Sequence, residues 1–412
     1  MSAYPIVSIV VAFAAMCVVV VGAAMARVGF PLPRADARIG RLDGLRGYLA
    51  VSVLGSHFLC WMEATRFSGA WKATTIPVLS GAGADAVSLF FMTTGILFYP
   101  RVLAGFRATS WKATLTNRFF RIIPLVVVSV AAITLIIALC VGRGLDRNYP
   151  VAALMWITAT HELPLLGYKD SGRLNAYVLW SLHFEWLFYL FVLPICAAVA
   201  DGLRRRTPRW ALPAALAVVP LFLNPHWLGG LMNFLPLFAV GMLAYELRER
   251  EKIRRVLETR WSAVAALVGL VVAMSLEFAA FRPCQVALFG FFFVCVACGN
   301  DILGTLASPG ARVLGECSYA IYLLHGTVLD LLFVEGGPAT RAFSVGALPA
   351  LLPIVAAAVV GLAAVAHILV ERPAIRLGHE LAGRWRAARP AAEIGAGRPA
   401  QQGRGGDAGG CG

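Results

Sequence analysis

Apolar runs close to the length of a bilayer crossing recur along this chain and limit what it can fold into. The 412 residues are 59% hydrophobic and only 14% charged, with a mean hydropathy of +0.75. Soluble domains carry roughly a quarter charged residues, and about 20 apolar residues span a membrane as a helix. The sequence therefore predicts an all-α, polytopic transmembrane bundle of about 11 helices. The candidate spans are 5–26, 44–62, 78–99, 122–142, 177–200, 211–224, 229–246, 261–280, 283–299, 317–334 and 345–370.

Charge at the ends of these runs predicts the topology. If the first helix is retained with its N-terminus outside, six segments lie in the cytoplasm: 27–43, 100–121, 201–210, 247–260, 300–316 and 371–412. Together with Arg46 at the membrane edge, these segments hold 28 of the 36 lysines and arginines, as the positive-inside rule requires. The net charge of +14 follows from this distribution and does not indicate a nucleic-acid partner.

The chain divides into three predicted regions. Residues 1–40 are an additional N-terminal helix with a cytoplasmic linker, and residues 41–378 are the membrane domain. Residues 379–412 are rich in Gly, Ala, Arg and Pro, a composition typical of a disordered tail. The connector 247–260 is predicted to be a solvated charged helix. The nine cysteines lie mostly in apolar runs, and we interpret them as small apolar residues rather than metal ligands.

Ionisable residues inside the second run are the first functional candidates. Arg41-Leu-Asp-Gly-Leu-Arg-Gly47 opens this run, so Asp43, Arg46 and His57 fall on one membrane helix, where charged groups are costly. Arg46 and His57 are eleven residues apart, roughly 16 Å along one helical face. A cation near one membrane surface, with an imidazole aligned above it, indicates a ligand with an anionic head and a reactive far end.

Two further arginines precede the fourth run. Arg118 and Arg121 are spaced i,i+3, so their guanidiniums point to one side. Ordinary positive-inside anchoring explains such a pair equally well. Arg46 lies at the same predicted membrane level, however, and three converging guanidiniums match phosphates. The pattern favours a phosphorylated cytoplasmic ligand.

Trp180-Ser-Leu-His-Phe-Glu185 places a carboxylate in the fifth run. Glu185 and His57 lie at comparable predicted depth, so we expect Glu185 to share a proton with His57 and to hold its tautomer. His183 points to a different face and is interpreted as a packing hydrogen bond.

Ser318, Tyr322 and His325 fall on one face of the tenth run, at i, i+4 and i+7. They are expected either to line a cavity or to form interhelical hydrogen bonds. Phe90-Phe-Met-Thr-Thr-Gly95 carries small residues, which let helices approach closely.

Taken together, these segments resemble the membrane-bound acyltransferase-3 family, which O-acylates bacterial glycans and some other molecules. The resemblance covers residues 41 to about 375, in the family's order. Its pieces are Arg41–Gly47 with His57, Phe90–Gly95, Arg118-Phe-Phe-Arg121-Ile-Ile-Pro124, Trp180–Glu185 with Phe188-Tyr189, Ser318-Tyr-Ala-Ile-Tyr-Leu-Leu-His325 and Glu371-Arg-Pro373.

The resemblance implies roles for individual residues. His57 matches the family's essential histidine, and Arg118 with Arg121 matches its acyl-donor motif. Two positions depart from the pattern: Thr94 stands where serine is common, and Trp186 replaces a second acidic residue after Glu185. The supporting residues expected around these groups are Asp43, Ser181, Tyr322 and His325.

The resemblance also implies an activity. We expect an O-acyltransferase of the bacterial cytoplasmic (inner) membrane, with its N-terminus outside and its C-terminus in the cytoplasm. Acyl-CoA, most simply acetyl-CoA, is the expected co-substrate, with no metal and no permanently bound cofactor. Arg46, Arg118 and Arg121 would bind its phosphates. His57 would act as a general base on a hydroxyl of a glycan or lipid-linked glycan at the periplasmic side, or as a transient acyl carrier. Glu185 would orient His57 or position the acceptor, and membrane lipid would surround the site.

Two rival interpretations use the same residues. A transporter of a lipid-linked sugar or an acyl group would need the buried charges as a substrate pathway. A membrane sensor would use the polar residues to hold its helices together. Acyl transfer by purified protein separates the first interpretation from both.

Overall fold

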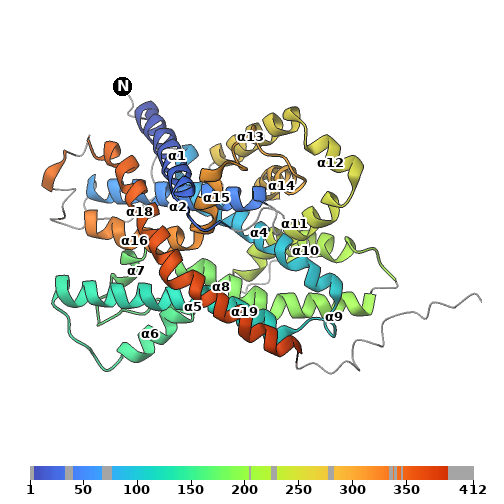
Figure 1. Cartoon of the computed structure of the whole chain (residues 1–412), viewed down its shortest axis with the longest axis horizontal. Coiled ribbons are helices and arrows are strands. Elements are labelled where there is room, and N and C mark those ends of the chain that lie inside the picture. The colour runs from blue at the N-terminus through green and yellow to red at the C-terminus, as the bar shows by residue number, and fades with distance from the viewer. Residues whose placement is uncertain are drawn as a thin grey trace, which may run out of the picture.

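The computed structural model describes residues 4–32, 40–66, 77–203, 206–223, 230–276, 283–333, 337, 341–344 and 347–387. Within these residues the protein is a bundle of helices without a strand, and the only β-type pairing there is an isolated bridge between Leu165 and Tyr168 (Figure 1). The predicted all-α class is confirmed for this part of the chain.

Each of the eleven apolar runs overlaps a helix within the described residues. The first half of the chain contains α1 (Tyr4–Arg27), α2 (Gly40–Arg66), α3 (Pro77–Ser80), α4 (Ala82–Ala104), α5 (Trp111–Ile136), η2 (Ile137–Val141), α6 (Tyr149–Ile157), α7 (Ser171–Leu174), α8 (Leu179–Leu187), η3 (Phe188–Val192) and α9 (Leu193–Leu203). The second half contains α10 (Ala211–Leu223), α11 (Leu231–Arg248), α12 (Glu251–Leu257), α13 (Arg260–Ser275), α14 (Pro283–Ala297), α15 (Pro309–Glu316), α16 (Ser318–Phe333), η5 (Leu348–Leu351), α18 (Leu352–Ala366), η6 (His367–Glu371) and α19 (Arg372–Ala387).

Length and composition single out fewer spans than the apolar runs predict. Among the described residues, five helices are long and apolar enough to cross a membrane, and a sixth is counted if the bent pair α12–α13 is one span. The five are Val7–Arg27, Ala82–Ala104, Trp111–Val141, Leu179–Leu203 and Leu348–Trp385. The helix α2 is long enough, but its ionisable residues lower its hydropathy. The protein is a multi-pass membrane bundle, and the count of eleven spans stays a prediction.

Ring contacts between distant helices show their relative directions. The contacts are His57–His325 and Phe58–Phe333 between α2 and α16, and Phe91–Phe234 and Tyr99–Tyr245 between α4 and α11. Between α4 and α11 the contacts advance along both helices together, so these two helices run parallel. For α2 and α16 the direction is given by Arg173, which contacts both Trp61 and Asp330, beyond His57 and His325 respectively, so these two also run parallel. This agrees with the alternation predicted from charge, in which the members of each pair cross the membrane in the same direction.

Glycines allow the helices that carry the candidate residues to touch at their backbones. A Cβ atom at Gly44 of α2 would overlap the carbonyl group of Leu306. A Cβ at Gly95 of α4 would overlap the carbonyl of Phe238 in α11, and Gly241 meets α4 in the same way. The predicted close approach at Gly95 is therefore confirmed.

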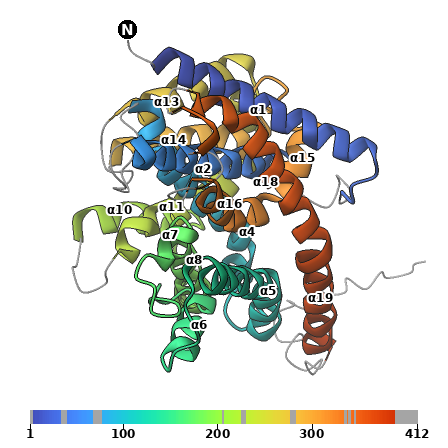
Figure 2. The same ribbon diagram turned by 90° about the vertical axis from the view of Figure 1, so that its left-hand side faces the viewer.

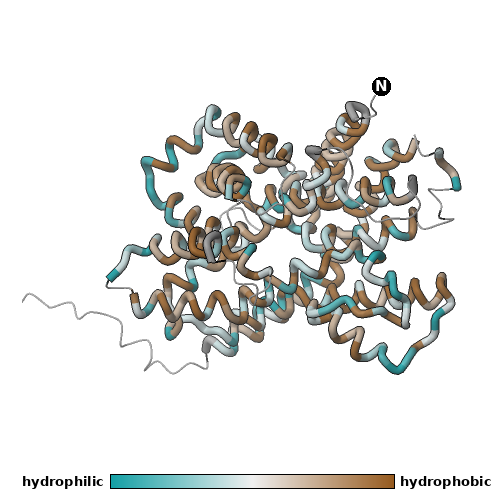
Figure 3. Tube along the Cα trace, turned by 180° about the vertical axis from the view of Figure 1, so that it is seen from behind, coloured by the Kyte–Doolittle hydropathy of each residue, from teal (hydrophilic) through white to brown (hydrophobic). Residues whose placement is uncertain are grey.

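The connector 247–260 forms a solvated helix, as predicted. The helix α12 has no buried residue, and Arg255 Nε lies 2.7 Å from Glu251 Oε1 one turn away. Figure 3 shows the same division, with hydrophobic residues along the helices and hydrophilic ones in connecting segments such as this one.

The C-terminal segment remains helical further than expected. The helix α19 follows α18 and η6 and packs along α5, with Gly378 against Phe120 and the Lys112 ammonium 5.4 Å from the Trp385 ring (Figure 2). It ends at Ala387, so the first part of the predicted disordered segment 379–412 is an ordered helix. Residues 388–412, and residues 33–39 of the predicted linker, lie outside the described residues.

Candidate active site

A cavity of about 410 Å³ lies between α2, α4, α5, α8 and α16. Every residue predicted for the site lines this cavity except the two histidines, His57 and His325. The polar side chains on its wall are Asp43, Arg46, Thr93, Thr94, Arg101, Arg118, Arg121, Ser181, Glu185, Tyr189, Ser318, Tyr319 and Tyr322. The three predicted arginines therefore converge on one space, although they come from helices far apart in the sequence.

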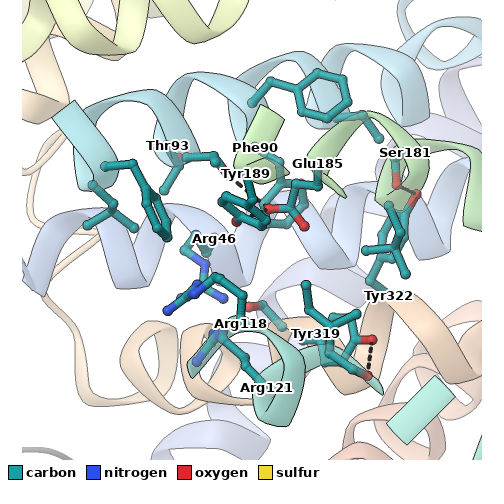
Figure 4. A pocket seen from close by; sticks show the side chains of 18 of the residues that line it. Arg46, Phe90, Thr93, Arg118, Arg121, Ser181, Glu185, Tyr189, Tyr319 and Tyr322 are labelled. Carbon is teal, nitrogen blue, oxygen red and sulfur yellow. Dashed lines mark hydrogen bonds between the residues drawn. The ribbon is translucent and has the colours of Figure 1, made fainter. Parts of the chain in front are cut away.

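Guanidiniums gather at one side of the cavity. Figure 4 shows Arg46, Arg118 and Arg121 together there. Arg46 Nη1 lies 3.7 Å from Asp43 Oδ1 on the same helix. The Arg118 guanidinium carbon is 4.9 Å from the centre of the Phe98 ring, so cation–π attraction holds this side chain against α4.

A fourth arginine, Arg101, belongs to this group. Its guanidinium carbon is 4.6 Å from the centre of the same Phe98 ring that Arg118 contacts. In the sequence, Arg101 is only one of the basic residues of the predicted cytoplasmic segment 100–121. Its i,i+3 spacing from Phe98 on α4 was the available signal.

Glu185 lies in the middle of the cavity wall. Its Oε1 accepts hydrogen bonds from Thr94 Oγ1 at 3.0 Å and from the Tyr189 hydroxyl at 2.9 Å. The prediction that Glu185 shares a proton with His57 is therefore wrong. Rise per residue predicts depth along a helix but not the direction of the side chain, and α8 turns Glu185 toward α4.

The opposite end of the cavity is closed by hydroxyl groups. Ser181 Oγ and the Tyr322 hydroxyl are 2.7 Å apart, and both lie within hydrogen-bonding distance of the Val178 carbonyl. The Phe90 ring packs edge-on against Tyr322, with ring centres 6.2 Å apart. Ser318 also lines the cavity, so the predicted stripe on α16 does face an interior space.

A histidine pair lies directly beyond this closed end. His57 Nδ1 and His325 Nε2 are 2.7 Å apart, and the Tyr322 ring centre is 6.2 Å from that of His325. The third member of the predicted stripe therefore pairs with His57 instead of lining the cavity. His183 Nδ1 lies 3.2 Å from the Ala159 carbonyl, as expected for a packing hydrogen bond.

A second polar layer follows the histidines. Trp61 is one turn beyond His57, and Asp330 is five residues beyond His325. Arg173, from α7, lies between them: its Nε is 3.7 Å from Asp330 Oδ1, and its guanidinium carbon is 5.1 Å from the Trp61 ring centre. The segment around α7 (Ser171–Leu174) thus covers the histidine pair on the side away from the arginines.

Glu162 anchors the end of this covering segment. Its Oε1 accepts a hydrogen bond from the backbone N–H of Leu179, the first residue of α8, at 3.2 Å. Burial raises the pKa of the Glu162 carboxyl to about 7, and the Leu179 hydrogen bond opposes that rise only in part. Ionising this carboxyl therefore works against the folded state.

Several wall residues were not predicted as part of the site. Besides Arg101, they include Phe98, Tyr189 and Tyr319, whose hydroxyl donates to the Ile122 carbonyl at 2.8 Å. Tyr189 and Tyr319 belong to motifs that carry the family resemblance, and that was the available signal for them. Phe98 had none, because aromatic residues are common in membrane helices. Within the described residues, no group of three or more His, Cys, Asp or Glu side chains could hold a metal ion.

Comparison with known proteins agrees with this geometry. The model of the acyltransferase domain family, acyltransferase-3, matches residues 39–369, which is most of the chain. The protein belongs to this family of membrane acyltransferases. Neither a curated protein nor a solved structure matches the chain.

Proposed function

We propose that this protein is a membrane O-acyltransferase that moves an acyl group, most simply acetyl, from cytoplasmic acyl-CoA to a hydroxyl of a cell-surface or exported glycan at the periplasmic side. One observation carries the proposal. Four arginines line one side of a cavity whose opposite end adjoins the His57–His325 pair. Such a space suits a donor with a phosphorylated head and a reactive far end.

The donor would enter with its phosphates at the arginines. Forked guanidiniums bind phosphate oxygens in pairs, and the aromatic contacts of Arg101 and Arg118 with Phe98 hold two of them in place before binding. From Arg101 to Phe90 the cavity follows eleven residues of α4, roughly 16 Å. The acylated pantetheine arm would extend along this distance toward Ser181 and Tyr322.

The chemistry requires a base near the acyl carbon. The acceptor hydroxyl oxygen forms a bond to the acyl carbon while the carbon–sulfur bond of the thioester breaks. His57 accepts the hydroxyl proton and passes it to the departing CoA sulfur. Glu185, held by Thr94 and Tyr189, lies on the cavity wall between the arginines and the closed end. It would orient the donor arm rather than His57.

The decisive experiment uses the purified full chain in lipid nanodiscs with radiolabelled acetyl-CoA and a membrane glycan fraction. Transfer of label is expected for the wild type, and His57→Ala should reduce it to background. His183→Ala is the matched control, since His183 contacts the Ala159 carbonyl and the ring of Phe184, neither of which lines the cavity. Full activity of a correctly inserted His57→Ala variant would overturn the proposal.

Donor binding is tested separately. Arg118→Gln and Arg121→Gln should each raise the KM for acetyl-CoA at least tenfold. Arg255→Gln, on the solvated α12, should leave it unchanged. Movement of a lipid-linked sugar across the nanodisc or vesicle bilayer without acyl transfer would instead favour a transporter.

A further inference from the structure

The hydrogen-bond geometry of His325 determines which nitrogen of His57 can act as a base. Both rings come from parallel helices, α2 and α16, with His57 Nδ1 2.7 Å from His325 Nε2. The ring planes are within 6° of parallel and the ring centres are 5.0 Å apart. That separation is the nitrogen–nitrogen distance plus about a ring radius on each side, as expected for a hydrogen bond in the plane of both rings.

A backbone carbonyl sets the proton position in this pair. His325 Nδ1 lies 3.0 Å from the carbonyl oxygen of Ile321, one turn back on α16. A carbonyl oxygen only accepts, so His325 Nδ1 carries the proton. In a neutral imidazole the other nitrogen, Nε2, is then the acceptor.

The hydrogen bond to His325 also fixes the proton position on His57. Because His325 Nε2 accepts, His57 Nδ1 must donate, and the lone pair of neutral His57 is on Nε2. His325 is completely buried, with 0% of its surface exposed, whereas His57 is partly exposed. Both nitrogens of His325 have partners within the protein, the Ile321 carbonyl and His57, so His325 cannot itself take the acceptor proton without breaking one of these bonds.

We infer that His325 is a positioning residue, which holds His57 in the Nδ1–H tautomer and leaves Nε2 as the basic nitrogen. This inference rests on the proposed function, because it assigns the partner of the proposed base. When His57 Nε2 takes the acceptor proton, Nδ1–H continues to donate to His325 Nε2, so the imidazolium keeps its hydrogen bond through the reaction. His325 thus fills the orienting role that the sequence suggested for Glu185.

Contacts on either side hold the His57 and His325 rings in their relative positions. Phe58, which follows His57 in α2, packs edge to face against Phe333 of α16, with ring centres 5.2 Å apart. On the opposite side Tyr322 is held by Ser181. Because packing fixes His325 on both sides, the orientation of its partner His57 is maintained during turnover.

The test compares His325→Leu with His325→Gln. Leucine cannot accept the Nδ1 proton of His57, so kcat for acetyl transfer should fall about 100-fold or more, while the KM for acetyl-CoA stays within about twofold. A glutamine Oε1 can accept in place of Nε2, and His325→Gln should recover kcat to within about tenfold of the wild type. His183→Leu, which removes a histidine bonded to a backbone carbonyl, should leave kcat unchanged.

The outcomes separate this inference from the proposed function. If the wild type transfers acetyl and His57→Ala does not, but His325→Leu keeps its full kcat, the positioning role is wrong and the activity stands. If His325→Gln binds acetyl-CoA normally yet is as inactive as His325→Leu, hydrogen-bond acceptance is not the role of His325, and the inference is overturned. If His325→Leu does not fold, His325→Met replaces it as the variant without a comparable acceptor, under the same criteria.

Discussion

The Phe98 ring, shared by two guanidiniums, gives a prediction whose magnitude follows from the structure. The guanidinium carbons of Arg101 and Arg118 lie 4.6 and 4.9 Å from its centre, and the ring itself is buried. Replacing Phe98 with Leu keeps an apolar side chain but removes the π face. Both arginines would then lose their cation–π contact with Phe98, although Arg118 keeps a longer one, 5.9 Å, to the Tyr189 ring.

Each cation–π contact contributes about 0.5–1 kcal/mol at an exposed site and about 2 kcal/mol when desolvated. Taking the lower, exposed-site value for each contact, the two together contribute at least about 1–2 kcal/mol to holding the site ready for a phosphate. Since about 1.4 kcal/mol corresponds to a tenfold change in affinity, Phe98→Leu should raise the Kd for acetyl-CoA roughly 5- to 30-fold.

Titration calorimetry of the protein in nanodiscs measures this Kd directly. Phe293→Leu is the matched control, because Phe293 is an equally buried ring in α14 and does not line the cavity. Its Kd should equal that of the wild type. The reasoning is refuted if Phe98→Leu binds acetyl-CoA within twofold of the wild type while its melting temperature matches that of Phe293→Leu.

Three further predictions concern stability, each measured by thermal melting in detergent. The pKa of Glu162 is raised to about 7 from an ordinary 4.5, so the folded state binds this proton more tightly than the unfolded state. The free energy of unfolding should therefore be constant below about pH 4.5. It should fall by up to about 3 kcal/mol as the pH rises to 7. Glu162→Gln should abolish this dependence, and an unchanged pH profile would contradict the assignment. Gly95→Ala should destabilise by about 1–3 kcal/mol, because its Cβ meets a backbone carbonyl that cannot move aside. Gly55→Ala, also inside a helix but with nothing within 4 Å of the added Cβ, should be neutral or stabilising by up to about 1 kcal/mol. Equal melting of both variants would refute the packing argument. Ser181→Ala and Tyr322→Phe should each lower stability, and the double variant should differ from their sum by about 0.5–1.5 kcal/mol through their 2.7 Å hydrogen bond; strict additivity would show that the bond contributes nothing.

Local features were predictable from the sequence because they depend on residues close along the chain. Helix formation satisfies backbone groups within the segment, which is obligatory in lipid, so apolar runs alone located the helices. The same applies to the solvated helix α12, whose charge pairs are one turn apart. The number of membrane crossings depends also on contacts between helices. A helix such as α2 carries ionisable groups that are stable in a membrane only when neighbouring helices surround them.

Much of the candidate site was also predictable. Arg46, Arg118 and Arg121 were expected at one membrane level, and they line one cavity with Ser181, Glu185 and the predicted face of α16. Depth follows from the rise of 1.5 Å per residue, and parallel helices bring equal depths together. Residue order and helix direction were therefore sufficient to assemble this list.

What only the tertiary structure decided is which side chains at equal depth become partners. His57 and Glu185 were expected to pair, yet α2 lies against α16 and α8 lies against α4, so His57 bonds to His325 and Glu185 to Thr94 and Tyr189. The lateral order of helices depends on contacts between segments hundreds of residues apart, such as backbone approaches at glycines and the interlocking of rings. Hydropathy and helical rise are properties of one segment, and they contain no information about which neighbour it meets.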